Sequence, residues 1–169
     1  MQGMNEFEAS KGVQVMKRKT IRRTTILPAG VEEIWDKLQQ LSTLQYIAKP
    51  YASFRPLEEG MQLWQAGEVS HFSLKLFGFL PLGVHRIQVV EFDKAQLTIY
   101  TNESNKFVPV WNHRILLEQL EDGACLYTDE VEIGAGILTP VVALWAGRFY
   151  RHRQRKWIRL LAKGLAQQG

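Results

Sequence analysis

The sequence predicts an α+β domain in which a curved antiparallel sheet of about seven strands wraps around one long C-terminal helix. Two observations predict this arrangement. Apolar and polar side chains alternate over residues 51–133, which is the period of half-buried strands, and short turns interrupt the alternation. Residues 138–165 instead repeat apolar side chains at steps of three and four positions, the period of a helix. Because this helix is the longest in the sequence, we expect it to cover the apolar face of the sheet.

The N-terminal part predicts one strand and two short helices. Residues 1–12 are polar and are expected to form a flexible tail ahead of a single domain at residues 13–166. Residues 13–27 are rich in Thr, Ile and Val with interspersed Lys and Arg, which predicts a long strand near an edge of the sheet. A short helix is predicted at residues 31–41, and a second one follows from Ser42, a candidate N-cap.

The alternating segment divides into further strands joined by short turns. Short turns imply that consecutive strands are neighbours in the sheet. Gly123 suits the left-handed position of a three-residue hairpin at residues 121–123. Residues 77–83 form an unusually apolar turn, which we expect to fold back on the core. A gate that touches ligand or membrane and a subunit contact are the alternatives. The predicted strands lie at residues 51–55, 63–77, 84–92, 97–103, 107–120 and 124–133.

The last helix combines an apolar face with a strongly basic one. Thr139 is its expected N-cap and Pro140 its first helical residue. Its apolar stripe contains Val142, Trp145, Phe149, Trp157, Leu160 and Leu161. Its basic residues are Arg148, Arg151, Arg153, Arg155, Lys156, Arg159 and Lys163, and no Asp or Glu follows Glu132. The favoured interpretation is a solvated face that pairs with acidic residues of the sheet, and contact with nucleic acid or anionic lipid is the alternative.

Composition and motifs exclude several classes of function. A hydrophobic fraction of 46% in 169 residues suffices for one core, so neither a disulfide nor a metal is required for stability. The single cysteine, Cys125, and the lack of a signal-peptide pattern lead us to expect a cytoplasmic protein. No glycine-rich phosphate loop occurs, and the four histidines lack metal-ligand spacing, so no cofactor or metal is expected. The net charge of +4 resides in the last helix, yet the strands carry no base-stacking motif, so nucleic acid is not an expected partner. The oligomeric state is left open.

Strand alternation predicts which polar side chains face the interior. The three-residue hairpin pairs Leu120 with Ala124, so that Ile115 faces Asp129 and His113 becomes a diagonal neighbour of Asp129 on the same face. Glu103 is a further candidate on that face. An apolar, aromatic interior with a few polar side chains is typical of a pocket for a hydrophobic molecule with one polar end. The predicted ligand-binding residues are Phe72, Leu74, Ile99, Trp111, His113, Ile115, Tyr127, Asp129, Trp145 and Phe149.

The segments ILPAGVEEIWDKL (26–38), LKLFGFLPLGVHRIQVVEF (74–92) and VPVWNHRILLEQLEDGACLYTDEVEI (108–133) carry a family resemblance. Together with the order of elements they resemble the Bet v 1-like, START-related (SRPBCC) superfamily, and more narrowly its bacterial polyketide cyclase/dehydrase and lipid-transport-like members. Trp111-x-His113 and Tyr127-x-Asp129 match strands of that group, but its frequent second histidine is Ile115 here. The resemblance implies a helix-grip fold around a cavity for lipids, polyketides, isoprenoids or other apolar molecules.

Three functions follow as hypotheses. The first is a carrier or binding protein for a small hydrophobic ligand, with His113 and Asp129 orienting a polar head group. The second is a cyclase or dehydratase in which His113 is the acid or base and Asp129 sets its tautomer. The third is an interaction module that docks on anionic lipid or an acidic partner through the basic helix. Binding is favoured over catalysis because the pair lacks a nucleophile, and a purely structural His–Asp pair is an equally open interpretation.

Overall fold

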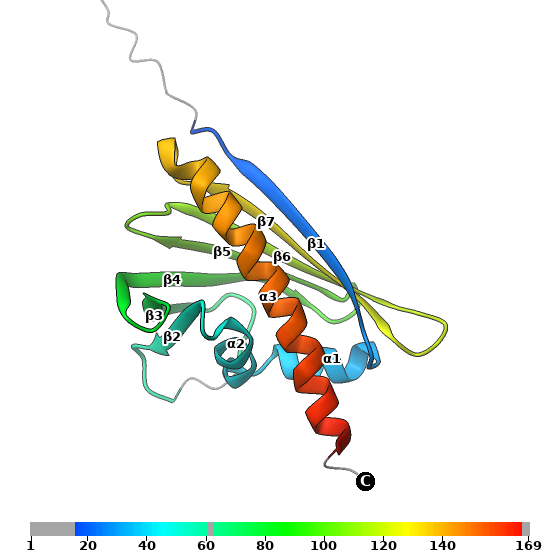
Figure 1. Cartoon of the computed structure of the whole chain (residues 1–169). Helices are drawn as coiled ribbons and strands as arrows, with labels where there is room; N and C mark the ends of the chain where they lie inside the picture. Colours follow the sequence, from blue (N-terminus) through cyan, green and yellow to red (C-terminus); the bar gives the residue numbers. More distant parts are fainter. Residues whose placement is uncertain (1–15, 61–62, 167–169) are drawn as a thin grey trace, which may run out of the picture.

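The computed structural model describes residues 16–60 and 63–166 of the chain, and the predicted tail at residues 1–12 lies outside them. The described chain contains seven strands and three α-helices (Figure 1). The helices are α1 (Val31–Leu38), α2 (Leu41–Ala48) and α3 (Thr139–Ala166), and a 3₁₀ turn (Gly136–Leu138) precedes α3. The strands are β1 (Lys19–Leu27), β2 (Ala52–Pro56), β3 (Val69–Leu76), β4 (Leu80–Asp93), β5 (Thr98–Asn105), β6 (Val110–Gln119) and β7 (Cys125–Gly134).

The strands form one antiparallel sheet that grips the 28-residue helix α3. Their order is β1-β7-β6-β5-β4-β3-β2, so that consecutive strands from β2 to β7 are neighbours, as the short turns predict. The predicted edge position of β1 is confirmed, because β1 pairs only with β7. Helix α3 lies across one face of the sheet and contacts β1, β7 and α2 (Figure 1). The predicted helix-grip fold is therefore confirmed.

Two irregularities in β4 curve the sheet. The register between β4 and β5 shifts between Val89 and Glu91, and that between β3 and β4 shifts opposite Leu74 and Lys75. Such bulges place an unpaired residue in one strand and bend it. The sheet is therefore bent at β4, on the side that β2, β3 and β4 form.

The strand predicted at residues 63–77 is shorter in the structure. Only Val69–Leu76 forms β3, while Leu63 makes an isolated bridge with Gln40. Gly67 adopts the left-handed region at φ 85°, which ends the extended run before β3 begins. The predicted apolar turn shrinks to residues 77–79, and Phe79 exposes 76% of its surface, so the expectation that it folds back on the core is wrong.

Thr139 starts α3 in a different way from the predicted N-cap. Its own backbone is helical (φ −48°, ψ −45°), and its hydroxyl accepts a hydrogen bond from the Ala135 amide at 2.9 Å. The hydroxyl also donates to the Gly136 carbonyl at 2.8 Å. Thr139 therefore fastens the end of β7 to the helix instead of capping the first helical turn.

The space between sheet and helix is solid at one end only. Near α1, the side chains of Trp35, Tyr127, Trp157 and Leu161 are each at most 3% exposed and fill it completely. Cys125 lies in the same packed cluster as a free thiol. Toward the start of α3 the packing opens into a cavity. Within residues 16–60 and 63–166, no helix is both long and apolar enough to cross a membrane.

Candidate functional site

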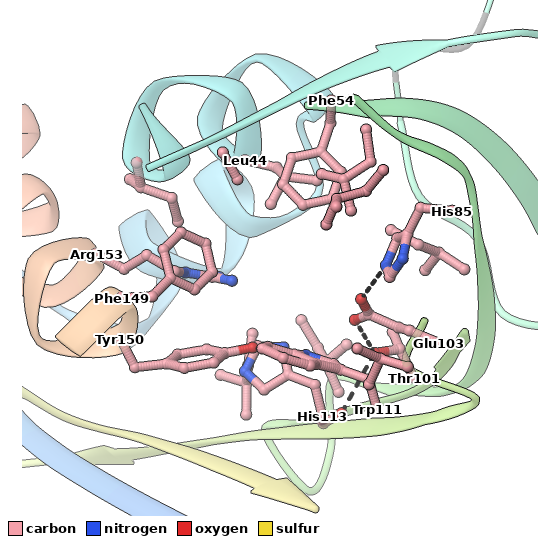
Figure 2. A pocket seen from close by; sticks show the side chains of 18 of the residues that line it. Leu44, Phe54, His85, Thr101, Glu103, Trp111, His113, Phe149, Tyr150 and Arg153 are labelled. Carbon is pink, nitrogen blue, oxygen red and sulfur yellow. Dashed lines mark hydrogen bonds and ion pairs between the residues drawn. The ribbon is translucent and has the colours of Figure 1, made fainter. Parts of the chain in front are cut away.

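A cavity of about 370 Å³ lies between the curved sheet, α2 and the N-terminal half of α3 (Figure 2). This volume is in the range of small-molecule sites. Its wall is mainly apolar and aromatic, with polar side chains at a few points. The apolar wall includes Leu44 and Ile47 of α2, Phe54 of β2, Leu74 of β3, Ile87 of β4, Ile99 of β5, Trp111 of β6, and Trp145 and Phe149 of α3.

The cavity opens where the strand ends meet the start of α3. Val141 and Phe107 line the cavity, yet they expose 67% and 50% of their surfaces. Figure 1 shows the β3–β4 turn, the β5–β6 turn and the start of α3 at the same end of the molecule. This end also carries the exposed apolar side chains Phe77, Phe79, Leu80, Ile137, Leu138 and Leu144.

The structure brings most of the predicted ligand-binding residues together around this cavity. Seven of them line it, namely Leu74, Ile99, Trp111, His113, Ile115, Trp145 and Phe149. Phe72 does not line the cavity. It is fully buried, and its ring centre lies 6.1 Å from that of Phe54 and 5.7 Å from that of Trp64. Tyr127 and Asp129 also lie outside the wall, because α3 packs over β7 and covers them. The sequence gives no signal for where α3 crosses the sheet.

His113 and Asp129 form the contact that the register predicts. Ile115 is opposite Asp129, and His113 Nε2 is 2.8 Å from Asp129 Oδ1. Asp129 is 1% exposed and also accepts hydrogen bonds from the Tyr127 hydroxyl and from Gln154 Nε2, at 3.2 and 3.1 Å. Burial, followed by the nearby Asp129 charge, raises the pKa of Tyr127 well above its ordinary value. The carboxylate therefore holds the His113 ring with Nε2–H pointing away from the cavity.

A second histidine–carboxylate pair lines the cavity: Glu103 lies on the interior face, as the alternation predicts, but its partner His85 was missed from the sequence. His85 Nε2 is 2.8 Å from Glu103 Oε2, and the Thr101 hydroxyl donates to Glu103 Oε1 at 2.8 Å (Figure 2). Burial by itself raises the pKa of Glu103, but the hydrogen bond and charge of His85 reverse this shift and hold the pKa below its ordinary value. The alternation of residues 84–92 could have revealed His85, because Ile87 shares its face.

Arg153 is the third polar element of the wall and corrects the predicted basic face of α3. It is 6% exposed and lines the cavity instead of facing solvent. Its guanidinium carbon lies 4.9 Å from the Tyr150 ring centre and 5.7 Å from that of Phe149. Trp145, Phe149 and Arg153 follow one another at intervals of four residues. This spacing could have predicted that Arg153 shares the inward face of the helix with the two aromatic residues.

Two indole groups, Trp111 of β6 and Trp145 of α3, contact aromatic side chains of α3 in the site. Trp111 Nε1 donates to the Tyr150 hydroxyl at 3.2 Å. This hydrogen bond fixes both aromatic side chains in the cavity wall. Trp145 stacks on Phe149 with ring centres 5.0 Å apart, and its Nε1 is buried with no hydrogen-bond partner among the described residues. Buried N–H groups normally have acceptors, so Trp145 offers a free donor beside the cavity.

The remaining basic face of α3 is exposed. Arg148, Arg151, Arg155 and Arg159 project into solvent, and none of them pairs with an acidic residue in the described part of the chain. The predicted pairing with acids of the sheet is therefore not found there. Among the described residues, no group of three or more His, Cys, Asp or Glu side chains is arranged to hold a metal ion.

Solved structures share this architecture over most of the chain. A protein from Chromobacterium violaceum aligns with a TM-score of 0.64 at 17% identity, covering 83% of this chain and 95% of its own. A protein from Thermus thermophilus aligns with a TM-score of 0.65 at 14% identity, over 86% of this chain and 99% of its own. Norcoclaurine synthase from Thalictrum flavum, solved with dopamine and hydroxybenzaldehyde, aligns with a TM-score of 0.66 at 10% identity. The alignment covers 95% of this chain and 98% of its own. At these identities the likeness establishes a Bet v 1-like fold and nothing about activity.

Sequence comparison places the site within one family. No curated protein matches this sequence. One family does match, over residues 25–161, a span that contains every side chain of the cavity wall and both histidine–carboxylate pairs. The chain therefore belongs to the family described as Domain of unknown function (DUF8410).

Proposed function

We propose that the protein binds or carries a small hydrophobic ligand, of lipid, polyketide or isoprenoid type, between the sheet and α3. The observation that supports this most is the cavity of about 370 Å³ with its predominantly apolar wall. Burying apolar surface is worth roughly 25 cal/mol per Å², so the aromatic wall supplies most of the affinity. The polar groups orient the ligand through a few directed hydrogen bonds. The Bet v 1-like fold, shared with a norcoclaurine synthase solved with dopamine and hydroxybenzaldehyde, supports this proposal.

The first experiment is native mass spectrometry of gently purified protein, with solvent extraction of whatever is released. We expect a discrete apolar adduct. Trp111→Ala and Phe149→Ala each remove an aromatic part of the wall and should reduce ligand retention. Trp157→Phe, in the packed end of the molecule, serves as the control because Trp157 does not line the cavity. Retention that is unchanged in both alanine variants would place the ligand elsewhere.

A cyclase or dehydratase acting on an aromatic or polyketide-like substrate is the second candidate. His113 reaches the cavity wall, and the bond to Asp129 fixes its ring, as a general acid or base requires. Turnover of an aromatic polyketide should then titrate near neutral pH and disappear in His113→Gln. A variant that retains full turnover would remove His113 from this role.

Peripheral contact with an anionic membrane is a further candidate. Exposed apolar side chains surround the opening of the cavity, with Phe79, Ile137 and Leu144 at 76%, 94% and 62% exposure. Exposed arginines continue along α3, and such a face attracts anionic lipid. The protein should co-sediment with vesicles that contain phosphatidylserine. The triple charge reversal Arg151→Glu, Arg155→Glu and Arg159→Glu should abolish this co-sedimentation. Binding that survives the reversal would assign these arginines to a solvated surface.

A further inference from the structure

Within the described part of the chain, Arg153 is a buried cation without a hydrogen-bond or ion-pair partner, in a largely apolar site. It exposes 6% of its surface, and its Nε atom is buried with no hydrogen-bond partner. A guanidinium carries five N–H donors, and leaving buried donors unsatisfied is costly. The aromatic faces of Tyr150 and Phe149 compensate part of the charge, but they accept no hydrogen bond along the plane of the guanidinium.

The carboxylates near Arg153 are occupied by other partners. Asp129 accepts its hydrogen bonds from His113, Tyr127 and Gln154, and it does not line the cavity. Glu103 is held by His85 and Thr101. Figure 2 shows Arg153 and the His85–Glu103 pair on opposite sides of the cavity. Neither carboxylate forms an ion pair with Arg153, so the guanidinium turns its donors toward the ligand space.

From this geometry we infer that the ligand is an amphipathic organic anion, with one carboxylate or comparable acidic group bound by Arg153. This inference rests on the proposed ligand-binding function and narrows it to a substrate class. A planar guanidinium matches a carboxylate in a bidentate geometry, and charge-assisted hydrogen bonds are among the strongest that proteins make. A group with several negative charges would leave charge unpaired, because Arg153 is the one Lys or Arg side chain in the described cavity wall.

The remainder of the wall indicates how the anion would lie. Phe149 and Trp145 precede Arg153 on the same face of α3, toward the opening, so the apolar body extends along these rings with its acidic end inward. Trp145 lies eight residues before Arg153, about 12 Å along the helix axis. Its unpartnered Nε1 can donate to an oxygen on the apolar body of the ligand.

A matched acid and alcohol test the inference. The neutral fluorophore N-phenyl-1-naphthylamine reports occupation of the cavity, and decanoic acid or 1-decanol displaces it at pH 8. We expect decanoate to displace the fluorophore at about ten- to a hundredfold lower concentration than decanol. In Arg153→Met the advantage of the acid should disappear while the fluorophore still binds. Arg148→Met is the control, because Arg148 lies on the same helix but is exposed, and it should leave the advantage unchanged.

The outcomes separate the two proposals. If the fluorophore and both competitors fail to bind the wild-type protein, the ligand-binding function itself is wrong. If they bind but decanoate has no advantage, or keeps it in Arg153→Met, only the anionic class is wrong. Arg153→Lys is the second variant should Arg153→Met not fold; it keeps the charge without the planar fork and should retain part of the advantage.

Discussion

Asp129 is a buried carboxylate whose hydrogen bonds come from three elements. It is 1% exposed and receives donors from β6 (His113), β7 (Tyr127) and α3 (Gln154). It therefore ties the sheet to the helix as well as orienting His113. This structural role holds for a binding protein and for an enzyme alike.

Asp129→Asn should destabilise the fold by about 3 kcal/mol or more, because the buried negative charge beside His113 is lost and an NH2 group replaces one of the two oxygens that accept hydrogen bonds, where it meets another donor. Urea unfolding followed by circular dichroism measures this. Glu130→Gln, on the outer face of the same strand, removes an exposed pairing with Arg22 and should change stability by less than about 0.5 kcal/mol. Equal effects of the two substitutions would contradict the role of Asp129.

Glu103 makes stability depend on pH in the acidic range. Its pKa in the folded protein lies below the ordinary value of 4.5. As the pH falls below about 4.5, the unfolded chain takes up a proton that the folded chain still excludes, so stability is lost through the lower, folded pKa. Wild type should therefore exceed Glu103→Gln in stability near pH 5, and the difference should shrink on further acidification. Urea titrations at several pH values measure the difference, and a widening gap at low pH would oppose this account.

At the scale of elements, the junction between β7 and α3 determines where the long helix starts. The Thr139 hydroxyl bridges the Ala135 amide and the Gly136 carbonyl across the break between strand and helix. Helix α3 carries both the packed residues near α1 and the cavity wall, so its starting point sets the depth at which Phe149 and Arg153 lie.

Thr139→Val removes this hydroxyl at nearly constant shape and should cost about 1–2 kcal/mol of stability. Thr139→Ser keeps the hydroxyl and should lose clearly less. Thermal unfolding of both variants gives the comparison. If serine and valine were equally destabilising, the methyl packing of Thr139 would matter and its hydrogen bonds would not.

For the molecule as a whole, the contrast between its packed and hollow parts is testable. Ala52 of β2 and Ala143 of α3 are each 2% exposed, but only Ala52 lines the cavity. Ala52→Leu should extend into free space, with little loss of stability and weaker binding of N-phenyl-1-naphthylamine. Ala143→Leu should overpack the core and cost about 1–3 kcal/mol. Unfolding and fluorophore titration measure both, and similar losses of stability would mean that the cavity is not available to side chains.

Much of this fold could be predicted because its signals are local. Alternation gave the strands and their inward faces, and one hairpin fixed the β6–β7 register that joins His113 to Asp129. The strand predicted at residues 63–77 begins late because of a single backbone position, Gly67, which precedes β3. Period and turn chemistry act between neighbours in sequence, and the printed residues contain that information directly.

The sequence by itself thus determined that consecutive strands from β2 to β7 are neighbours, the long amphipathic helix and one histidine–carboxylate pair. Only the tertiary structure decided that Tyr127 and Asp129 lie under α3, that His85 meets Glu103, and that Arg153 faces inward without a partner. It also decided that aromatic side chains fill the space between sheet and α3 at one end and leave a cavity at the other. The physical reason is that these features depend on where α3 crosses a sheet bent at β4, a balance of contacts between residues far apart in the chain.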